Sequence, residues 1–163
     1  MSGKQSGLNH LNEDGDARMV DVTDKDVTAR SATARCTVTI SAEVAELLVA
    51  GGLPKGDAIA VARVAAIQAT KRTPDLIPLC HPIAVHGVDV DIVIDQTAPS
   101  VVITSTVRTA DRTGVEMEAL TSAAVGGLTI IDMVKGKDRS AAIAEVVLLE
   151  KIGGRSGHWT REP

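Results

Sequence analysis

Residues 85–109 read VHGVDVDIVIDQTAPSVVITSTVRT, and this stretch decides the fold. Apolar and polar side chains alternate along 85–95 and again along 100–109, which is the pattern of a strand with one buried face. The link from Gln96 to Pro99 is short and carries a proline, so it joins two neighbouring strands by a turn. The stretch therefore predicts an antiparallel β-hairpin.

The segments on both sides of this hairpin predict two further strands and three helices. Ser41 and Asp57 are good N-caps, Gly51-Gly52 ends the first helix, and Gly114 opens the third. The expected elements are a strand over 34–40, helices over 42–50, 58–71 and 115–135, and a strand over 144–151. Apart from the additional short helix, this order is that of a ferredoxin-like α+β domain. Such a domain has an antiparallel four-stranded sheet with helices packed on one face.

Length and composition favour one domain without nucleic-acid or membrane partners. The 163 residues carry a net charge of −4 and a pI of about 5.5, so the overall charge does not attract nucleic acid or anionic lipid. Trp159 is the only aromatic residue, which removes the rings on which single-stranded nucleic acids stack. We expect a flexible N-terminal arm over 1–18 and a single domain over 19–163.

Cysteine usage indicates a reducing compartment. Cys36 and Cys80 lie far apart and form no CxxC pair, which argues against a disulfide framework and against a structural zinc site. The first 18 residues lack the apolar core of a leader, and no stretch approaches 18 uninterrupted apolar residues. The sequence therefore predicts a soluble, unprocessed, cytoplasmic protein.

Residues 71–82, KRTPDLIPLCHP, form a proline-rich loop with polar groups at both ends. Three prolines fix φ and remove amide donors, so neither a helix nor a paired strand is expected to run through it. Its apolar middle predicts that the loop presses against the core and presents Lys71, Arg72, Cys80 and His81 to a small ligand. A lone histidine is more often structural, but His81 is suited to acid-base work or phosphate binding. For Cys80 we favour a lining role, since no separate base is evident.

Both ends of the predicted long helix carry candidate site residues. Glu116, Met117 and Glu118 fall in its first turn, and Asp132 and Lys135 in its last. The helix dipole favours these charges by itself, so each residue alone has an equally plausible structural role. Asp132 and Lys135 are three residues apart on one face, where a carboxylate can orient an ammonium group or form a proton-transfer pair.

These two ends are too far apart for one small molecule. Glu118 and Asp132 are fourteen residues apart, which is about 21 Å along a helix axis. Either there are two sites, or a neighbouring chain completes one site. The stretch 124–127, Ala-Val-Gly-Gly, offers a smooth surface for close packing between subunits, which makes a shared site reasonable.

Lys55 lies in a glycine-flanked loop at the start of a predicted helix. Backbone amides at such a place attract phosphate, and a lysine adds a charge. The local pattern by itself favours a solvated turn lysine, and the chain has no GxxxxGK[ST] loop. The other cations expected in this region, which together would suit a polyphosphate, are Arg30, Arg63, Lys71 and Arg72.

Several long motifs of the chain match one known family in the same order. They are MVDV at 19–22, KGD at 55–57, KRT and DLIPLCHP within 71–82, TGVEMEALT at 113–121 and TIIDMVK at 129–135. From Leu8 to Gly157 the chain resembles the cyclic pyranopterin monophosphate synthase family, also called the molybdenum cofactor biosynthesis protein C family. Motifs of this number and length are highly specific.

The resemblance implies a ferredoxin-like subunit in a homohexamer, a trimer of dimers with each active site at a dimer interface. It implies conversion of (8S)-3′,8-cyclo-7,8-dihydroguanosine 5′-triphosphate to cyclic pyranopterin monophosphate with release of diphosphate. This is a phosphorus-oxygen lyase reaction early in molybdenum cofactor (molybdopterin) biosynthesis. By match to the family's motifs, Lys55, Asp132 and Lys135 are the catalytic group. The implied substrate-binding residues are Arg30, Lys71, Leu79, Cys80, His81, Glu116, Met117 and Glu118.

One position departs from the family's pattern. Small apolar residues usually follow the matched lysine, whereas Gly136-Lys137 follows Lys135 here. Glycine lowers helix propensity by about 1 kcal/mol relative to alanine. We therefore expect the helix to end sooner and Lys135 to be more mobile.

Two alternative functions use the same residues. A noncatalytic nucleotide- or pterin-binding module would need the cations and His81, but a carboxylate such as Asp132 weakens simple triphosphate binding and is more suited to proton transfer. An RNA-binding module is disfavoured by the missing Phe and Tyr and by the acidic pI. A metal site of Cys80, His81 and Asp132 has no supporting ligand spacing, and we expect no metal and no cofactor.

Overall fold

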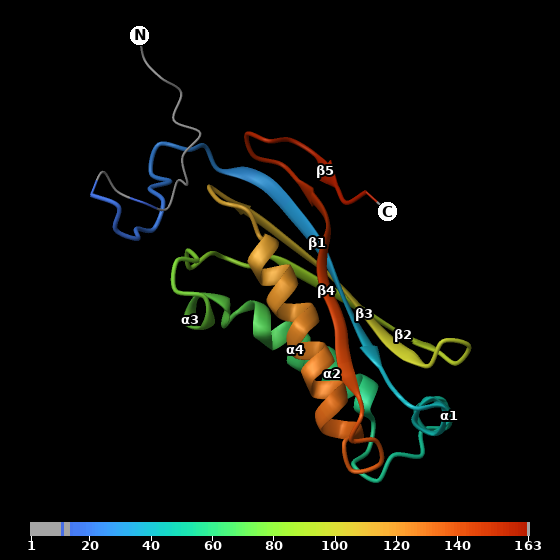
Figure 1. Ribbon diagram of the computed structural model, residues 1–163. Coiled ribbons are helices and arrows are strands. Elements are labelled where there is room, and N and C mark those ends of the chain that lie inside the picture. Colours follow the sequence, from blue (N-terminus) through green and yellow to red (C-terminus); the bar gives the residue numbers. More distant parts are fainter. Residues whose placement is uncertain (1–10, 12–13, 163) are drawn as a thin grey trace.

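The computed structural model describes residues 11 and 14–162 as an α+β fold with a single antiparallel sheet (Figure 1). The sheet has five strands in the order β2-β3-β1-β4-β5, one more strand than expected. The strands are β1 (Thr28–Thr39), β2 (Gly87–Asp95), β3 (Ser100–Asp111), β4 (Ala142–Ile152) and β5 (Trp159–Thr160). The helices are α1 (Ala42–Ala50), α2 (Ala58–Thr70), α3 (Thr73–Leu76) and α4 (Glu116–Val134). Residues 1–10 and 12–13 of the predicted arm lie outside the described residues.

The predicted hairpin is confirmed as β2 and β3. The two strands pair antiparallel from Gly87 opposite Arg108 to Asp95 opposite Ser100. Asp95 Oδ1 accepts hydrogen bonds from the backbone N–H groups of Thr97 and Ala98, at 2.8 and 3.1 Å, and so closes the turn. This local bonding explains why a short polar link is sufficient to reverse the chain.

The central strand β1 starts six residues before the predicted start at Ala34. It pairs with β3 on one side and with β4 on the other. Its alternate residues Ala32, Ala34, Cys36 and Val38 are buried, whereas Thr28 and Ala29 are exposed. Because the first residues lack a buried apolar face, alternation along the sequence did not reveal the strand's true start.

Side-chain caps fix the first two helices at the predicted places. Ser41 Oγ accepts a hydrogen bond from Val44 N, and Asp57 Oδ1 accepts one from Ala60 N, so both are N-caps. Gly51 ends α1 in the left-handed conformation, with φ 68°. A cap at each start thus determines where each of these two helices begins.

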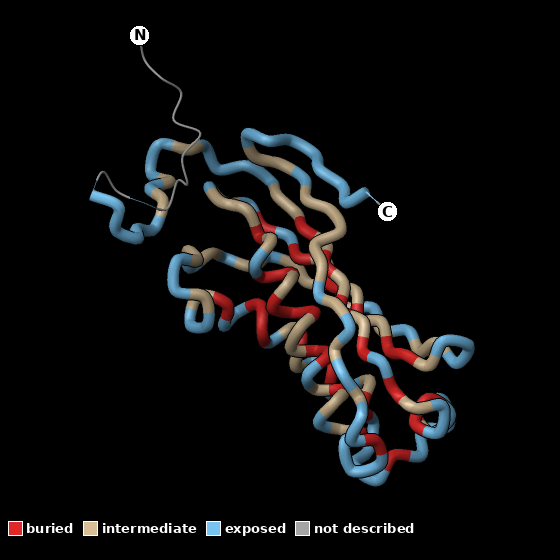
Figure 2. The backbone as a smooth tube through the Cα atoms, in the orientation of Figure 1, coloured by how far each residue is buried: buried red, intermediate tan, exposed pale blue. Residues whose placement is uncertain are grey.

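Helices α2 and α4 cover one face of the sheet, and the buried segments lie between the two layers (Figures 1 and 2). Gly127 of α4 faces β1 so closely that an added Cβ would lie 2.5 Å from Cys36 Sγ. Gly126 similarly faces Ile103 of β3. These two glycines therefore allow α4 to pack closely on the sheet of its own chain. Our inference that they provide a smooth surface for a subunit contact was wrong.

Helix α4 has a composition that would also suit a membrane span. It is 19 residues long, with a mean hydropathy of 1.3 over an 18-residue window. Here it contacts β1, β3, β4 and α2. A core helix that packs on both a sheet and a second helix has the same apolar composition.

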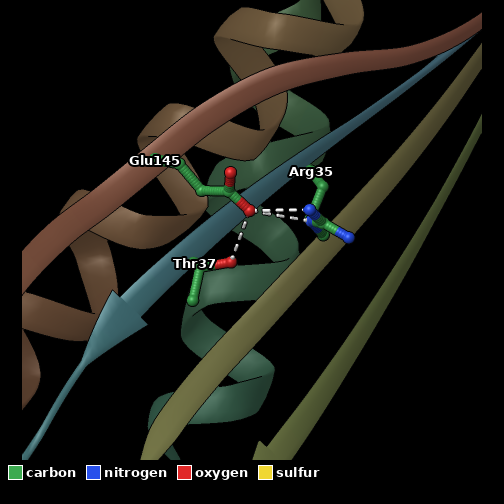
Figure 3. A network of polar contacts seen from close by, with 3 residues as sticks. All are labelled: Arg35, Thr37 and Glu145. Atoms are coloured by element: carbon green, nitrogen blue, oxygen red, sulfur yellow. Dashed lines mark hydrogen bonds and ion pairs between the residues drawn. The ribbon is translucent and has the colours of Figure 1, made fainter. Parts of the chain in front are cut away.

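The open face of the sheet is polar. Arg35 Nε and Nη2 both donate to Glu145 Oε1, at 3.1 and 2.7 Å, and Thr37 Oγ1 donates to the same oxygen (Figure 3). Arg35 and Thr37 flank the buried Cys36 along β1, so they point away from the helices. Thr33 and Thr106 form a further hydroxyl pair across β1 and β3.

The proline-rich loop 71–82 differs from the prediction. It contains the single helical turn α3, which tolerates Pro74 because a proline in a first turn costs no helical hydrogen bond. Thr73 is buried, but Leu76 is 57% exposed and Leu79 36%. Because its apolar side chains reach the surface, the loop does not press inward within one chain.

The short strand β5 was not predicted. Trp159 and Thr160 pair with Lys151 and Glu150 of β4 after a glycine-rich turn. A two-residue strand is too short for a sequence period to be visible. The last long strand, β4, extends the predicted 144–151 range at both ends.

Candidate active site

The three residues expected to form the catalytic group lie together at the end of α4. Lys135 Nζ is 2.7 Å from Asp132 Oδ1, and Lys55 Nζ is 3.2 Å from Asp132 Oδ2. Lys55 also donates to the backbone carbonyl of Asp132 at 2.6 Å. One carboxylate therefore lies between two ammonium groups that come from different parts of the chain.

Local structure explains how Lys55 reaches this place. Leu53 is buried, and Gly56 N donates to Leu53 O, so a tight turn holds the lysine between them. Gly56 has φ 92°, a conformation that favours glycine. The carbonyl of Asp132 is one of the free acceptors at the C-terminal end of a helix, where a cation also interacts favourably with the helix dipole.

Electrostatics keeps Asp132 ionised. Hydrogen bonds from Lys135 and then Lys55, together with their charges, lower the pKa of Asp132 below its usual value of 3.8. The side chains of Lys55, Asp132 and Lys135 are about half exposed. At neutral pH, Asp132 is thus a carboxylate that accepts hydrogen bonds and orients both lysines within reach of solvent.

Helix α4 ends at Val134, and Lys135 is its C-cap. Lys137 N and Asp138 N both donate to Val134 O, so the chain turns sharply after Gly136. Whether α4 ends sooner here than in other members of the family stays a prediction. Lys135 remains anchored through Asp132 rather than through another turn of helix.

A second group of candidate residues lies at the other end of α4. Cys80 Sγ donates to Glu118 Oε1 at 3.5 Å, so the proline-rich loop is joined to the first turn of the helix. Burial, followed by the neighbouring Glu118 charge, raises the pKa of the Cys80 thiol to about 12. The thiol is therefore protonated near neutral pH and suits the lining role that we assigned to it.

Glu118 has a buried carboxyl group that forms no ion pair with any cation of the described residues. Its side chain is fully buried, and among the described residues Glu118 Oε2 has no hydrogen-bond partner. Burial raises the pKa of Glu118. Burial shifts the balance of such a carboxyl toward its protonated form, and Glu118 links the loop to α4 through Cys80.

His81 faces a pocket of about 370 Å³ beside the same helix end. His81 Nε2 lies 2.7 Å from the backbone carbonyl of Val20, which fixes the ring. Apart from Lys25 and Thr113-Gly114, the pocket is lined by Val20, Val22, Leu79, Cys80, His81, Glu116 and Met117. Five of the expected substrate-binding residues, from 79–81 and 116–117, thus share one cavity.

Two residues at this end had no role assigned from the sequence. Lys151 of β4 lies 3.9 Å from Glu116 Oε1 and donates to the hydroxyl of Ser156. Lys151 therefore pairs with Glu116, which lines the pocket. Only folding brings Lys151 and Glu116 together, so their spacing along the sequence gave no signal for this ion pair.

Arg30 and Lys71, the remaining expected binding residues, occupy different surroundings. Arg30 donates to the backbone carbonyls of Asp111 and Arg112, at 2.8 and 3.1 Å, beside the start of α4. Lys71 caps α2 and lines an open depression together with Arg72 and Gln68. Arg63, another cation expected nearby, donates to Val90 O of β2.

The candidate residues therefore form two separate clusters. The first, which we call the lysine cluster, comprises Lys55, Asp132 and Lys135. The second, the cysteine pocket, is the cavity lined by 79–81 and 116–117, with Glu118 behind Cys80. Glu118 and Asp132 are fourteen residues apart on one helix, which is about 21 Å. Among the described residues of one chain, no group of three or more His, Cys, Asp or Glu could hold a metal ion.

Comparisons with known proteins match nearly the whole chain. Residues 19–154 match the model of the MoaC family. The chain is 55% identical to the cyclic pyranopterin monophosphate synthase of a Nocardioides species, over 99% of each chain. It is 57% identical to the enzyme of the same name from Streptomyces coelicolor, over 96% of this chain and 91% of that one.

A more distant relative gives the same result. The cyclic pyranopterin monophosphate synthase of Geobacter sulfurreducens is 51% identical over 95% of this chain and 97% of its own. Identity of this level over nearly full length leaves no large part of the chain unmatched. The chain belongs to the MoaC family.

Proposed function

We propose that this chain is a cyclic pyranopterin monophosphate synthase. It converts (8S)-3′,8-cyclo-7,8-dihydroguanosine 5′-triphosphate to cyclic pyranopterin monophosphate and releases diphosphate, a lyase reaction of molybdenum cofactor biosynthesis. The observation that carries this function is the near-full-length identity of 51–57% to synthases of that name. The lysine cluster supplies the charges and proton acceptors that such a reaction needs.

The lysine cluster is the proposed catalytic group. In the ring-closing step a substrate hydroxyl forms a bond to the α-phosphorus, its proton is accepted by a base, and the bond to the diphosphate breaks. Lys55 and Lys135 neutralise the phosphate charge or transfer protons, and the ionised Asp132 orients both ammonium groups. A merely phosphate-binding module would gain nothing from a carboxylate fixed between its two lysines.

The cysteine pocket is the proposed substrate-binding region. Leu79, His81 and Met117 contact the substrate from its walls, and Cys80 and Glu116 contribute polar groups. Glu118 contributes indirectly, because its buried carboxyl accepts the Cys80 thiol hydrogen bond. Lys71 and Arg30 complete the set as cations at the same end of the helical layer.

We propose that a neighbouring chain completes each site, in a homohexamer built as a trimer of dimers. The separation of the lysine cluster from the cysteine pocket supports this assembly, since one small substrate cannot contact both in one chain. The outer surface of the helical layer also carries exposed apolar side chains, including Val61 and Val64 of α2 and Leu128 of α4. Surfaces of this kind are typical of subunit interfaces.

The remaining parts of the proposal concern fold type, domain and location. The strand order β2-β3-β1-β4 with two layered helices supports a ferredoxin-like domain over 19–163, to which β5 and the short helices are additions. The free thiols Cys36 and Cys80 are compatible with the cytoplasm. Small-molecule substrate binding requires neither nucleic acid nor a membrane.

Mixing two inactive variants tests the shared site. Lys135→Ala removes the lysine cluster and His81→Ala removes the cysteine pocket, so each variant alone should lose turnover. If the halves come from different chains, a mixed dimer has one intact site, and random exchange restores about one quarter of wild-type activity. The control mixture of Lys55→Ala with Lys135→Ala should restore nothing. No restoration in the first mixture after verified subunit exchange would contradict the shared site.

A further inference from the structure

A second cavity adjoins the cysteine pocket and is rich in cations. Its volume is about 440 Å³, and the charged residues that line it are Asp24, Lys25, Asp26, Arg30, Arg112 and Arg155. We call it the arginine cavity. Four cations against two carboxylates give its lining a net charge of +2, in a chain whose net charge is −4. Such a local excess of positive charge attracts an anion.

Arg30, which lines this cavity, is held in place by backbone groups. Its guanidinium donates to the carbonyls of Asp111 and Arg112, which uses two of its five N–H donors. Gly154 approaches the guanidinium so closely that a Cβ there would collide with Arg30 Nη1. With φ 72°, Gly154 is also in a conformation that favours glycine. The chain thus fixes an arginine that still has free donors.

The other three cations have no side-chain partner within the part of the chain that the structure describes. Among the described residues, the side chains of Lys25, Arg112 and Arg155 make no hydrogen bond or ion pair, whereas the other lysines and arginines near the candidate site are mostly engaged. Arg112 follows β3, Arg155 lies in the turn before β5, and Lys25 comes from the segment before β1. Three distant parts of the chain therefore bring unpaired cations to one hollow.

The arginine cavity and the cysteine pocket are neighbours. Both are lined by Lys25, Thr113 and Gly114, so an extended ligand that crosses these three residues would reach both. The cysteine pocket has apolar walls, including Leu79 and Met117, which suit a ring system. The arginine cavity offers charge, which suits phosphates. This division matches the two chemically different ends of a nucleoside triphosphate derivative.

We propose that the arginine cavity binds the two outer phosphates of the substrate and the diphosphate that leaves, with Lys25, Arg112 and Arg155 as binding residues. This inference rests on the proposed function. It fixes the direction of the substrate: the ring system lies in the cysteine pocket, and the α-phosphate lies at the Thr113-Gly114 junction. Arginine forks match phosphate oxygens by paired hydrogen bonds, which explains arginines at two of the three positions.

Calorimetry with inorganic diphosphate tests the cavity directly. Wild-type protein should bind diphosphate more tightly than inorganic phosphate, because the cavity offers several cations. Arg112→Ala and Arg155→Ala should each weaken diphosphate binding about tenfold or more, since each removes a charge-assisted hydrogen bond. Arg155→Lys should retain part of the affinity. The matched control is Arg161→Ala, which removes an exposed arginine that does not line the cavity.

Turnover of the cyclic triphosphate separates this inference from the proposed function. The account predicts that Arg112→Ala and Arg155→Ala raise KM about tenfold or more, and more than they lower kcat. If wild-type protein turns over the substrate but both variants match Arg161→Ala in KM and in diphosphate affinity, the inference is overturned while the function stands. If the variants lose diphosphate affinity but wild-type protein has no turnover, the anion site stands and the proposed function fails.

Discussion

Replacement of Gly127 by alanine is a demanding test of how α4 packs on the sheet. An added Cβ would lie 2.5 Å from Cys36 Sγ and 3.2 Å from Val38 Cγ2, whereas carbon atoms pack best at about 3.5–4.0 Å. Cys36 and Val38 are fully buried on β1, which is paired on both sides. Neither side chain can therefore withdraw, and α4 must shift or the central strand must distort.

The magnitude follows from two opposing contributions. Overpacking of a tight core costs about 1–3 kcal/mol, and alanine regains about 1 kcal/mol of helix propensity over glycine. The 2.5 Å contact with the sulfur places this site in the upper part of the overpacking range, at about 2–3 kcal/mol, so we expect a net loss of about 1–2 kcal/mol in the free energy of unfolding. For a chain of this size, that corresponds to a decrease in Tm of about 2–8 °C.

Urea denaturation at one fixed protein concentration measures this loss, because association contributes to the stability of an oligomer. Gly136→Ala is the matched control, since an added Cβ there meets nothing within 4 Å. In the double variant Cys36→Ala/Gly127→Ala the sulfur is absent, so the two substitutions should be coupled by about 1–2 kcal/mol. A Gly127→Ala protein as stable as wild type, or purely additive effects in the cycle, would refute the packing argument.

Three further predictions concern Asp138 and Cys80. Asp138 accepts hydrogen bonds from Ser41 N and from the N–H and hydroxyl of Ser140, so Asp138→Ala should lower the free energy of unfolding by about 2–3 kcal/mol in urea denaturation. These bonds, those of Ser140 above all, lower the pKa of Asp138 below 3.8. The stability that Asp138 contributes is therefore complete above pH 3.8 and is lost as the pH falls through the lowered pKa of the folded protein. The difference in the free energy of unfolding between wild type and Asp138→Ala should shrink below pH 3.8. A difference that does not change with pH would contradict this role of the ionised Asp138 side chain. Burial raises the pKa of the half-buried Cys80 thiol to about 12. The thiol should therefore react with iodoacetamide at pH 8 far more slowly than glutathione, as followed by peptide mass spectrometry. A rate equal to that of glutathione would contradict the raised pKa.

The elements with a clear local signal could be predicted from the sequence. Ser41 and Asp57 marked the helix starts because an N-cap acts within a few residues, and the 85–109 alternation marked the hairpin because one face is buried. The start of β1 could not be found in this way, since its pairing with β3 depends on residues about eighty positions away. The pair Trp159-Thr160 is a strand only because β4 lies beside it.

In the candidate site, too, local contacts could be predicted from the sequence and long-range contacts could not. Asp132 and Lys135 could be paired from their helical spacing, whereas the contact of Lys55 with Asp132 spans 77 residues and follows from the antiparallel arrangement of α2 and α4. The burial of Glu118 was not predictable, because an acidic residue in a first helix turn is usually exposed. The glycines at 126 and 127 were assigned to a subunit contact because the sequence does not reveal which face of α4 meets the sheet.

The central claim is that Asp132, held between two lysines, takes part in turnover of the cyclic triphosphate. The most direct measurement follows diphosphate release and pyranopterin formation by purified wild-type protein and by Asp132→Asn. The account predicts turnover by the wild type and a decrease of at least about a hundredfold in Asp132→Asn, with both proteins equally folded. Tight substrate binding without turnover by the wild type, or an unchanged rate in Asp132→Asn, would contradict it.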